Sequence, residues 1–163
     1  MGFAGYIKRK YLALCAKMMR ETASPEYIAR GWAIGMFYGC AIPFGFQLIL
    51  SLPTAFLLRG SKIGASVGTL ITNHFTIFLI YPVQCLIGNR LIGGNLSHRQ
   101  IGDAMNSLIS EQSYGKLFSL GHELVLSFFV GGALLAAVMT PLTYYAIKSF
   151  VERRRLRKER REQ

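Results

Sequence analysis

Two long apolar runs, residues 31–58 and 63–89, constrain the fold of this chain more than any other feature. Neither run contains an Asp, Glu, Lys or Arg, and only Arg59 and Lys62 carry charge between them. Each run exceeds the roughly 20 apolar residues that a helix needs to cross a bilayer. Hydrophobic residues make up 52% of the sequence and the mean hydropathy is +0.32, which favours a membrane protein over a soluble domain. We therefore expect an all-α integral membrane protein.

Both runs are interrupted near their middle. Pro43 lacks a backbone donor and Gly45 permits unusual dihedral angles, so a helix break is predicted there. Polar residues at 72–76 interrupt the second run at a corresponding place. Backbone groups freed at membrane depth must be satisfied by protein or by a water-filled cavity. Each broken run therefore predicts a re-entrant hairpin or a bent crossing, and we favour a re-entrant hairpin for the first.

Glycines recur every four residues in both runs, and the two patterns are offset by 29 residues. Small residues at this spacing let two helices approach closely within a bilayer. Repeated segments with paired helix interruptions are also the plan of many secondary transporters. A true duplication and a chance alignment of glycine-rich sequence both explain the echo, and the sequence leaves them open. The glycines expected at helix contacts are Gly31, Gly35, Gly39, Gly64 and Gly68.

The net charge of +11 is concentrated at the two ends of the chain. Six of the 19 Lys and Arg residues lie at or before Arg30, and eight lie at or after Lys148. Basic segments beside apolar runs stay in the cytoplasm and attract anionic lipids. We therefore expect a multi-pass membrane protein with both termini cytoplasmic, and Arg153, Arg154 and Arg155 at lipid headgroups. Nucleic-acid binding is the other interpretation of a basic tail, but the membrane already accounts for the charge.

Composition divides the chain into five parts. Ser24 and Pro25, followed by Glu26, form a helix-start signal, because Ser caps, Pro fits the first turn and Glu suits the positive end of the helix dipole. The tail after Lys148 is expected to continue the last helix. The predicted parts are an amphipathic interfacial helix at 1–23, a membrane domain with two broken helical segments at 24–92, a surface helix and loop at 93–119, a transmembrane helix at 120–148 and a basic cytoplasmic tail at 149–163.

Four polar residues near the two interruptions form a candidate membrane site: Gln47, Asn73, His74 and Thr76. An ionisable side chain within a membrane is a functional candidate because its burial is costly, and histidine titrates near neutral pH. Paired interruptions would bring Gln47 and Asn73 together between half-helices, whose N-termini favour an anionic group. The alternative is that the two amides only satisfy the broken backbone and that His74 is a neutral imidazole bonded to a facing helix.

Patterns for catalysis or metal binding are absent from the sequence. Cys15, Cys40 and Cys85 lack the spacing of a metal site, and there is no P-loop, GxSxG or HExxH. His122 and Glu123, at the edge of the last apolar run, are either a proton-handling pair or a solvated interfacial pair. We expect no enzymatic activity, no cofactor and no metal.

A pattern of small and polar residues extends over about 40% of the chain, from 24 to 88. It comprises Ser24, Pro25, Ile28, Ala29, Gly31, Ala33, Ile34, Gly35, Gly39, Pro43, Gly45, Gln47, Leu58, Arg59, Thr69, Asn73, Thr76, Tyr81 and Gly88. In these positions the chain resembles a bacterial membrane family catalogued only as domain of unknown function two thousand and sixty-two. The family pattern has Asn-Pro-x-Thr where this chain has His74 after Asn73, so the second break is expected to be softer or His74 to add chemistry.

The resemblance implies an integral protein of the bacterial inner (cytoplasmic) membrane and brings no established activity. Some members look fused to glycosyltransferases, which implies a link to lipid-linked sugars or envelope lipids. Transport or translocation of a small solute or an envelope lipid is our first hypothesis. The alternative is a structural or assembly subunit whose glycine stripes bind another membrane protein. A chain of 163 residues is short for a solitary transporter, so a homo-oligomer or a partner membrane protein is expected besides the bilayer and its anionic lipids.

Overall fold

The computed structural model describes residues 23–70, 72, 76–97, 99, 101–103 and 121–162. The predicted interfacial helix at 1–23 and most of the surface helix at 93–119 lie outside these residues. Within them the fold is helical and contains no strand, as the sequence predicts. The helices are α2 (Pro25–Ala41), α3 (Gln47–Leu57), α4 (Lys62–Thr69), α5 (Ile77–Leu91) and α8 (His122–Glu162).

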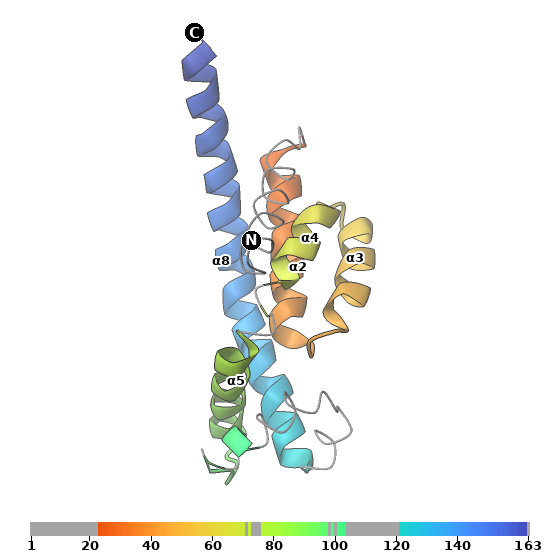
Figure 1. The fold of residues 1–163 in the computed structure, drawn as a ribbon, viewed down its shortest axis with the longest axis vertical. Helices are drawn as coiled ribbons and strands as arrows, with labels where there is room; N and C mark the ends of the chain where they lie inside the picture. The colour runs from red at the N-terminus through yellow and green to blue at the C-terminus, as the bar shows by residue number, and fades with distance from the viewer. Residues whose placement is uncertain are drawn as a thin grey trace, which may run out of the picture.

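The longest helix, α8, runs the length of the molecule, and α2 and α5 pack along it (Figure 1). Its 41 residues span roughly 60 Å. Helix α5 lies against the first part of α8, where the Tyr81 and Phe128 rings meet edge to face at 4.9 Å. Helix α2 lies against the later part, where Met36 and Cys40 pack on Ala136. The predicted continuation of the last apolar run into a helical basic tail is confirmed, because α8 continues through that tail.

The start of α2 follows the predicted signal. The Ser24 hydroxyl accepts a hydrogen bond from Tyr27 N at 3.2 Å, Pro25 occupies the first turn, and Glu26 is the acidic residue there. Capping by Ser satisfies a backbone donor that has no partner within the helix. The signal at Ser24 therefore sets where the apolar part of the described chain begins.

The first interrupted run folds into an antiparallel helical hairpin of α2 and α3 (Figure 1). Helix α2 ends at Ala41, just before Pro43, and Gly45 has a φ of 103°, a left-handed angle that costs glycine little. Across the hairpin, Tyr38 Oη and Thr54 Oγ1 lie 2.8 Å apart. At its open end, Arg30 Nη1 donates to Leu58 O at 2.9 Å. Both ends of this run therefore lie at the same end of the molecule.

The second run is interrupted as well, but its two helices do not form a hairpin. Figure 1 shows α4 and α5 pointing the same way along the molecule, one after the other. At the 29-residue offset, the positions of Pro43 and Gly45 correspond to Thr72 and His74. The second run thus lacks the proline and the glycine that reverse the chain in the first, so segments that echo one another in sequence fold differently.

Glycines hold α2 and α4 in close parallel contact. A Cβ added at Gly31 would lie 2.2 Å from Ser61 O, and one at Gly35 would lie 2.2 Å from Ala65 O. From the other side, a Cβ at Gly68 would lie 2.7 Å from Trp32 O. These distances are shorter than any real Cβ contact, so only glycine allows the two backbones to come this close. The two glycine stripes therefore meet each other within one chain.

Much of the outer surface is apolar. Ile49, Phe56 and Leu57 on α3 have exposed fractions of 66%, 67% and 76%. The segment His122–Arg157 of α8 is long and apolar enough to span a membrane, and only 33% of its most apolar window is buried. The core helix of a soluble protein is usually mostly buried.

Candidate polar site at the helix interruptions

Gln47 lies at the start of α3, and its side chain is buried with 3% of its surface exposed. Its Nε2 donates to Gly39 O at 3.2 Å and to Ile42 O at 3.0 Å. These carbonyls belong to the end of α2, where the chain breaks and the usual helical donors are missing. The amide therefore bonds to backbone carbonyls that the interruption frees. This is the role that the second of the two sequence interpretations gave to Gln47.

Thr72 joins the second interruption to the first. Its Oγ1 lies 2.9 Å from Gln47 Nε2 and donates to Gly39 O at 2.9 Å. The absence of a side chain at Gly39 gives the hydroxyl room, because a Cβ at this position would lie only 3.3 Å from Thr72 Oγ1. The two interruptions thus meet at one buried set of hydrogen bonds, formed by an amide, a hydroxyl and a helix-terminal carbonyl.

The other predicted site residues are Asn73, His74 and Thr76. Asn73 and His74 lie outside the described residues, so their positions stay predictions. Thr76 occupies the N-cap position of α5, but its side chain makes no capping hydrogen bond. Its carbonyl accepts from Leu79 N at 3.1 Å and Ile80 N at 2.8 Å, which starts the helix.

Gln84 is a buried polar residue that the sequence interpretation did not select. Its side chain on α5 is fully covered, and Nε2 donates to Phe128 O on α8 at 2.9 Å. Its Oε1 has no hydrogen-bond partner within the described part of the chain. A Cβ at Gly132 would lie 2.4 Å from Gln84 Nε2 and 2.8 Å from Cys40 O, so α5, α8 and the end of α2 converge here. The sequence did contain a signal for this residue, because Gln84 is an amide within an apolar run that has no charged residue.

The hairpin tip is fixed to α5 beside this convergence. Phe44 N, between Pro43 and Gly45, donates to Tyr81 Oη at 2.7 Å. The Tyr81 ring in turn packs on Phe128 of α8. The breaks, Gln84 and the tip are therefore parts of one junction of four helices, which we call the polar junction: Gly39, Gln47, Thr72, Gln84 and Gly132.

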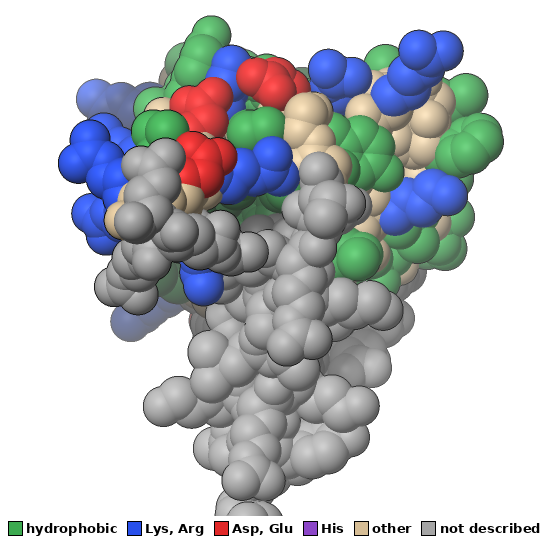
Figure 2. Space-filling view, turned by 90° about the horizontal axis from the view of Figure 1, so that it is seen from above, with side chains coloured by type: hydrophobic (Ala, Val, Ile, Leu, Met, Phe, Trp, Pro, Cys, Tyr) green, Lys and Arg blue, Asp and Glu red, His purple; other side chains and the backbone are tan. Residues whose placement is uncertain are grey.

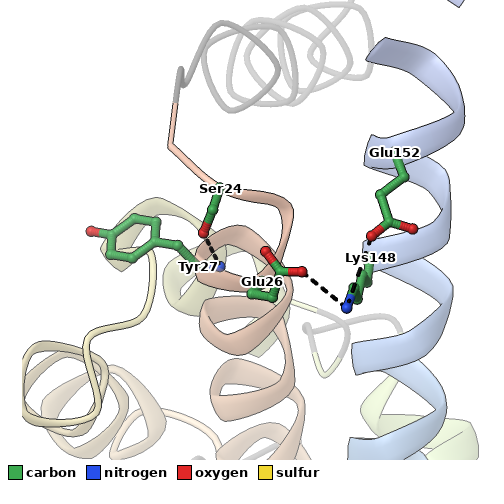
Figure 3. Close-up of polar contacts among 5 residues, drawn as sticks. All are labelled: Ser24, Glu26, Tyr27, Lys148 and Glu152. Atoms are coloured by element: carbon green, nitrogen blue, oxygen red, sulfur yellow. Dashed lines mark hydrogen bonds and ion pairs between the residues drawn. The ribbon is translucent and has the colours of Figure 1, made fainter. Parts of the chain in front are cut away.

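Charged groups gather away from this junction, at the end where α2 begins. Lys148 Nζ lies 2.9 Å from Glu26 Oε1 and 3.9 Å from Glu152 Oε1 (Figure 3). The hydrogen bond to Lys148 lowers the pKa of Glu26, and the same contact raises the pKa of Lys148. Figure 2 looks onto this end and shows Lys and Arg side chains around it. The pair joins the first turn of α2 to α8 where the apolar part of α8 ends.

His122 and Glu123 begin α8 at the other end of the molecule. His122 is exposed, whereas Glu123 is partly buried and its Oε1 accepts a hydrogen bond from Asn95 N at 2.5 Å. Glu123 therefore holds the loop that follows α5. Among the described residues, no three His, Cys, Asp or Glu side chains come together as a metal site would require.

One comparison with known proteins gives a result. The family described as "Uncharacterized protein conserved in bacteria (DUF2062)" matches residues 8–160, which is nearly the whole chain. No curated protein and no solved structure matches significantly.

Proposed function

This chain belongs to the uncharacterised bacterial family that matches it, and from that premise we propose that it is an inner-membrane protein that moves a small solute or an envelope lipid across the bilayer. We further propose that it does so without enzymatic chemistry or a cofactor, through the polar junction.

The distribution of charge supports placement in a membrane. Residues 124–147 of α8 carry no charge and form about 36 Å of helix, close to the roughly 30 Å of bilayer hydrocarbon. Arg30, Arg59, Lys62 and Lys148 lie at one end of this length. Glu123, at the start of α8, and Arg90, in the last turn of α5, lie at the other end. Between these levels the described chain has no charged side chain.

These levels support a topology with two crossings and one re-entrant hairpin. Helix α8 and the α4–α5 pair would each cross, while the α2–α3 hairpin would enter from the basic end and return to it. Arg155 Nη2 donates to Ala23 O, so the start of the described chain lies beside the basic tail. The positive-inside rule would place both in the cytoplasm, with Arg153, Arg154 and Arg155 near anionic lipid headgroups.

The observation that carries the transport proposal is the buried, incompletely paired polarity at the junction. An amide oxygen without a partner is costly in an apolar medium, and such groups in membranes mark sites that bind a substrate. Gln84 Oε1 is such an atom, and the Gln84 amide lies beside Gly132, next to the Cys40 carbonyl near the end of α2. Interrupted helices at the membrane midplane are the usual binding sites of secondary transporters.

The alternative, an assembly subunit that binds a partner through its glycines, loses its main support. Gly31, Gly35 and Gly68 already contact backbone of the same chain. A partner membrane protein or a second copy would have to use another surface. A Gly35→Leu substitution would therefore test folding rather than partner binding, because Gly35 has no room for a side chain.

Reconstitution of the purified protein into liposomes tests the proposal. A fluorescent phospholipid and a panel of small anionic solutes would be followed across the bilayer, with Gln84→Met as the main variant. Methionine keeps the length of the side chain and removes its polar atoms, so translocation should fall at least tenfold while folding is retained. Ser51→Ala is the matched control, because Ser51 is buried on α3 and its Oγ has no partner among the described residues. Equal translocation by wild type and Gln84→Met would contradict a role for the junction, and no movement of any probe would contradict the function.

A further inference from the structure

Three cationic side chains lie at the open end of the α2–α3 hairpin. Arg30 comes from α2, Arg59 from the connection after α3 and Lys62 from the start of α4, and all three are exposed. Arg30 Nη1 donates to Leu58 O at 2.9 Å and to Arg59 O at 3.3 Å, so its guanidinium is fixed where α3 ends. Lys62 Nζ lies 4.9 Å from the centre of the Phe56 ring. We call Arg30, Arg59 and Lys62 the hairpin mouth.

Arg59 has a left-handed backbone conformation, with a φ of 51°, at a position that helix ends usually give to glycine. Arg59 N donates to Phe56 O at 3.3 Å. Gly60 N donates to Ala55 O at 2.7 Å, which completes the Schellman pattern of a helix end. A residue with a Cβ is strained in this conformation, and strained residues are concentrated at functional sites. The arginine at this position therefore indicates a use for its side chain.

No carboxylate among the described residues neutralises the hairpin mouth. The sequence has no Asp or Glu between Glu26 and Asp103, and Glu26 pairs with Lys148 on the side of α2 that faces α8. Figure 2 looks onto this end and shows Lys and Arg side chains among hydrophobic ones on the side where α3 lies. Cations without a counter-ion attract an anionic group.

The surface of α3 that leads up to the mouth is apolar and uncovered. Ile49, Phe56 and Leu57 expose most of their side chains. Helix α3 has 11 residues and a length of about 16 Å, which matches the roughly 15 Å of hydrocarbon in one leaflet of a bilayer. An acyl chain of that leaflet would therefore extend along α3 while its headgroup lies at the level of the three cations.

We propose that the hairpin mouth binds the phosphate of an anionic phospholipid whose acyl chains lie against α3. Arginine donates to phosphate oxygens in pairs, and lysine adds a positive charge. A zwitterionic phospholipid fits less well, because its ammonium group would bring a further cation to the mouth. A second copy of the chain, packed mouth to mouth, would bring like charges together. The inference rests on the membrane placement proposed above but not on transport through the polar junction.

Lipid binding by the full-length protein tests the site. Protein freed of lipid in mild detergent would be titrated with phosphatidylglycerol or phosphatidylcholine, and bound lipid would be counted by native mass spectrometry. Each basic residue near an anionic lipid strengthens binding about fivefold, so the wild type should prefer phosphatidylglycerol by about tenfold or more. The preference should weaken as salt is raised.

Arg59→Gly separates binding from folding, because its two effects have opposite signs. Glycine removes one cation and relieves the left-handed backbone, so phosphatidylglycerol binding should fall about fivefold while the protein unfolds at an equal or higher temperature. Lys62→Gln, at an exposed side chain, should weaken binding to a similar extent. Arg157→Gln is the matched control: it removes the same charge from the exposed tail, and its lipid binding should equal that of the wild type.

Equal affinity of the wild type for the two lipids would overturn the inference, as would undiminished binding by Arg59→Gly and Lys62→Gln. An equal loss in Arg157→Gln would also overturn it, because net charge rather than the mouth would then decide binding. Gln84→Met should bind phosphatidylglycerol like the wild type although its translocation falls. A wild type that translocates without preferring the anionic lipid would refute this site and leave the proposed function, and the reverse result would refute the function and leave the site.

Discussion

At the scale of single residues, buried polar atoms decide how this chain tolerates its helix breaks. The two N–H groups of Gln47 Nε2 face three acceptors within hydrogen-bond distance: Gly39 O, Ile42 O and Thr72 Oγ1. Without this amide, Ile42 O would lose its side-chain donor, and Gly39 O would keep only the donor from Thr72 Oγ1. Ser51, one turn further along α3, is buried too, but its Oγ has no partner in the described residues. Gln47 and Ser51 lie on the same face of α3, but only Gln47 makes side-chain hydrogen bonds among the described residues.

This difference predicts opposite outcomes for two substitutions. Gln47→Leu should lower the free energy of unfolding by about 1–3 kcal/mol, because it removes the amide donor from the carbonyls at the end of α2. Ser51→Ala should change it by less than about 0.5 kcal/mol or raise it, since no hydrogen bond within the described chain is lost. Equilibrium unfolding in detergent measures both. If Ser51→Ala proved as destabilising as Gln47→Leu, the assignment of the hydrogen bonds would be wrong.

At the scale of helices, α2 and α4 are joined by direct contact between their backbones. Gly31, Gly35 and Gly68 bring the two backbones together, and Ser61 N donates to Tyr27 O at 3.0 Å where the contact begins. Close approach of this kind replaces the hydrophobic driving force that helices lack in lipid. The glycine stripes are therefore part of folding.

Gly35→Ala should destabilise the protein by about 1–3 kcal/mol, because a Cβ there lies 2.2 Å from Ala65 O and forces the helices apart. Gly102→Ala is the matched control: Gly102 is also helical, but nothing lies within 4 Å of an added Cβ. Alanine there should be neutral or stabilising by up to about 1 kcal/mol. Unfolding curves of the two variants separate packing from helix propensity, and equal effects would contradict the close contact.

The Glu26–Lys148 pair joins α2 to α8 and predicts how that contact depends on pH. The lowered pKa of Glu26 means that its contribution to stability is present at neutral pH and is lost as the pH falls through that lowered value. The raised pKa of Lys148 means that its contribution is lost only as the pH rises through that raised value. Stability should therefore fall at both extremes. In Lys148→Gln the loss in acid should shift toward the ordinary glutamate range, as NMR titration of the Glu26 carboxyl would show.

At the scale of the whole molecule, the described charges lie at two ends and the apolar surface lies between them. Helix α8 supplies the one span in the described chain that is long and apolar enough to cross a membrane by itself. The α4–α5 pair is long enough to cross a membrane only when both helices and the interruption between them are counted. Helix α3 alone is too short to cross. The proposed topology therefore depends on the arrangement of helices rather than on their individual lengths.

Labelling of single cysteines in a chain without native cysteines tests this topology. Cysteines placed at Lys62 and at Glu159, both exposed, should react only with reagent that reaches the cytoplasm. A cysteine at exposed Asn95, in the loop after α5, should react from the opposite side. Leu57, which is 76% exposed on α3, should be protected from water-soluble reagents by lipid. Labelling of positions 62 and 95 from the same side would contradict the proposed crossings.

The sequence by itself determined the helical class, the helix start at Ser24, the break at Pro43 and Gly45, and the continuation of α8 into its basic tail. Capping, a missing backbone donor and glycine dihedrals act within a few residues, so they can be read along the chain.

Only the tertiary structure decided what those local features join. It turned the two glycine stripes toward each other, assigned the Gln47 amide to the carbonyls at the end of α2, and placed Gln84 beside Gly132. It also brought Arg30 to the carbonyls at the end of α3, although these residues lie far apart in the chain. The echoing runs took different courses for the same reason: contacts between distant segments depend on where each helix points, and periodicity along the chain does not record that direction.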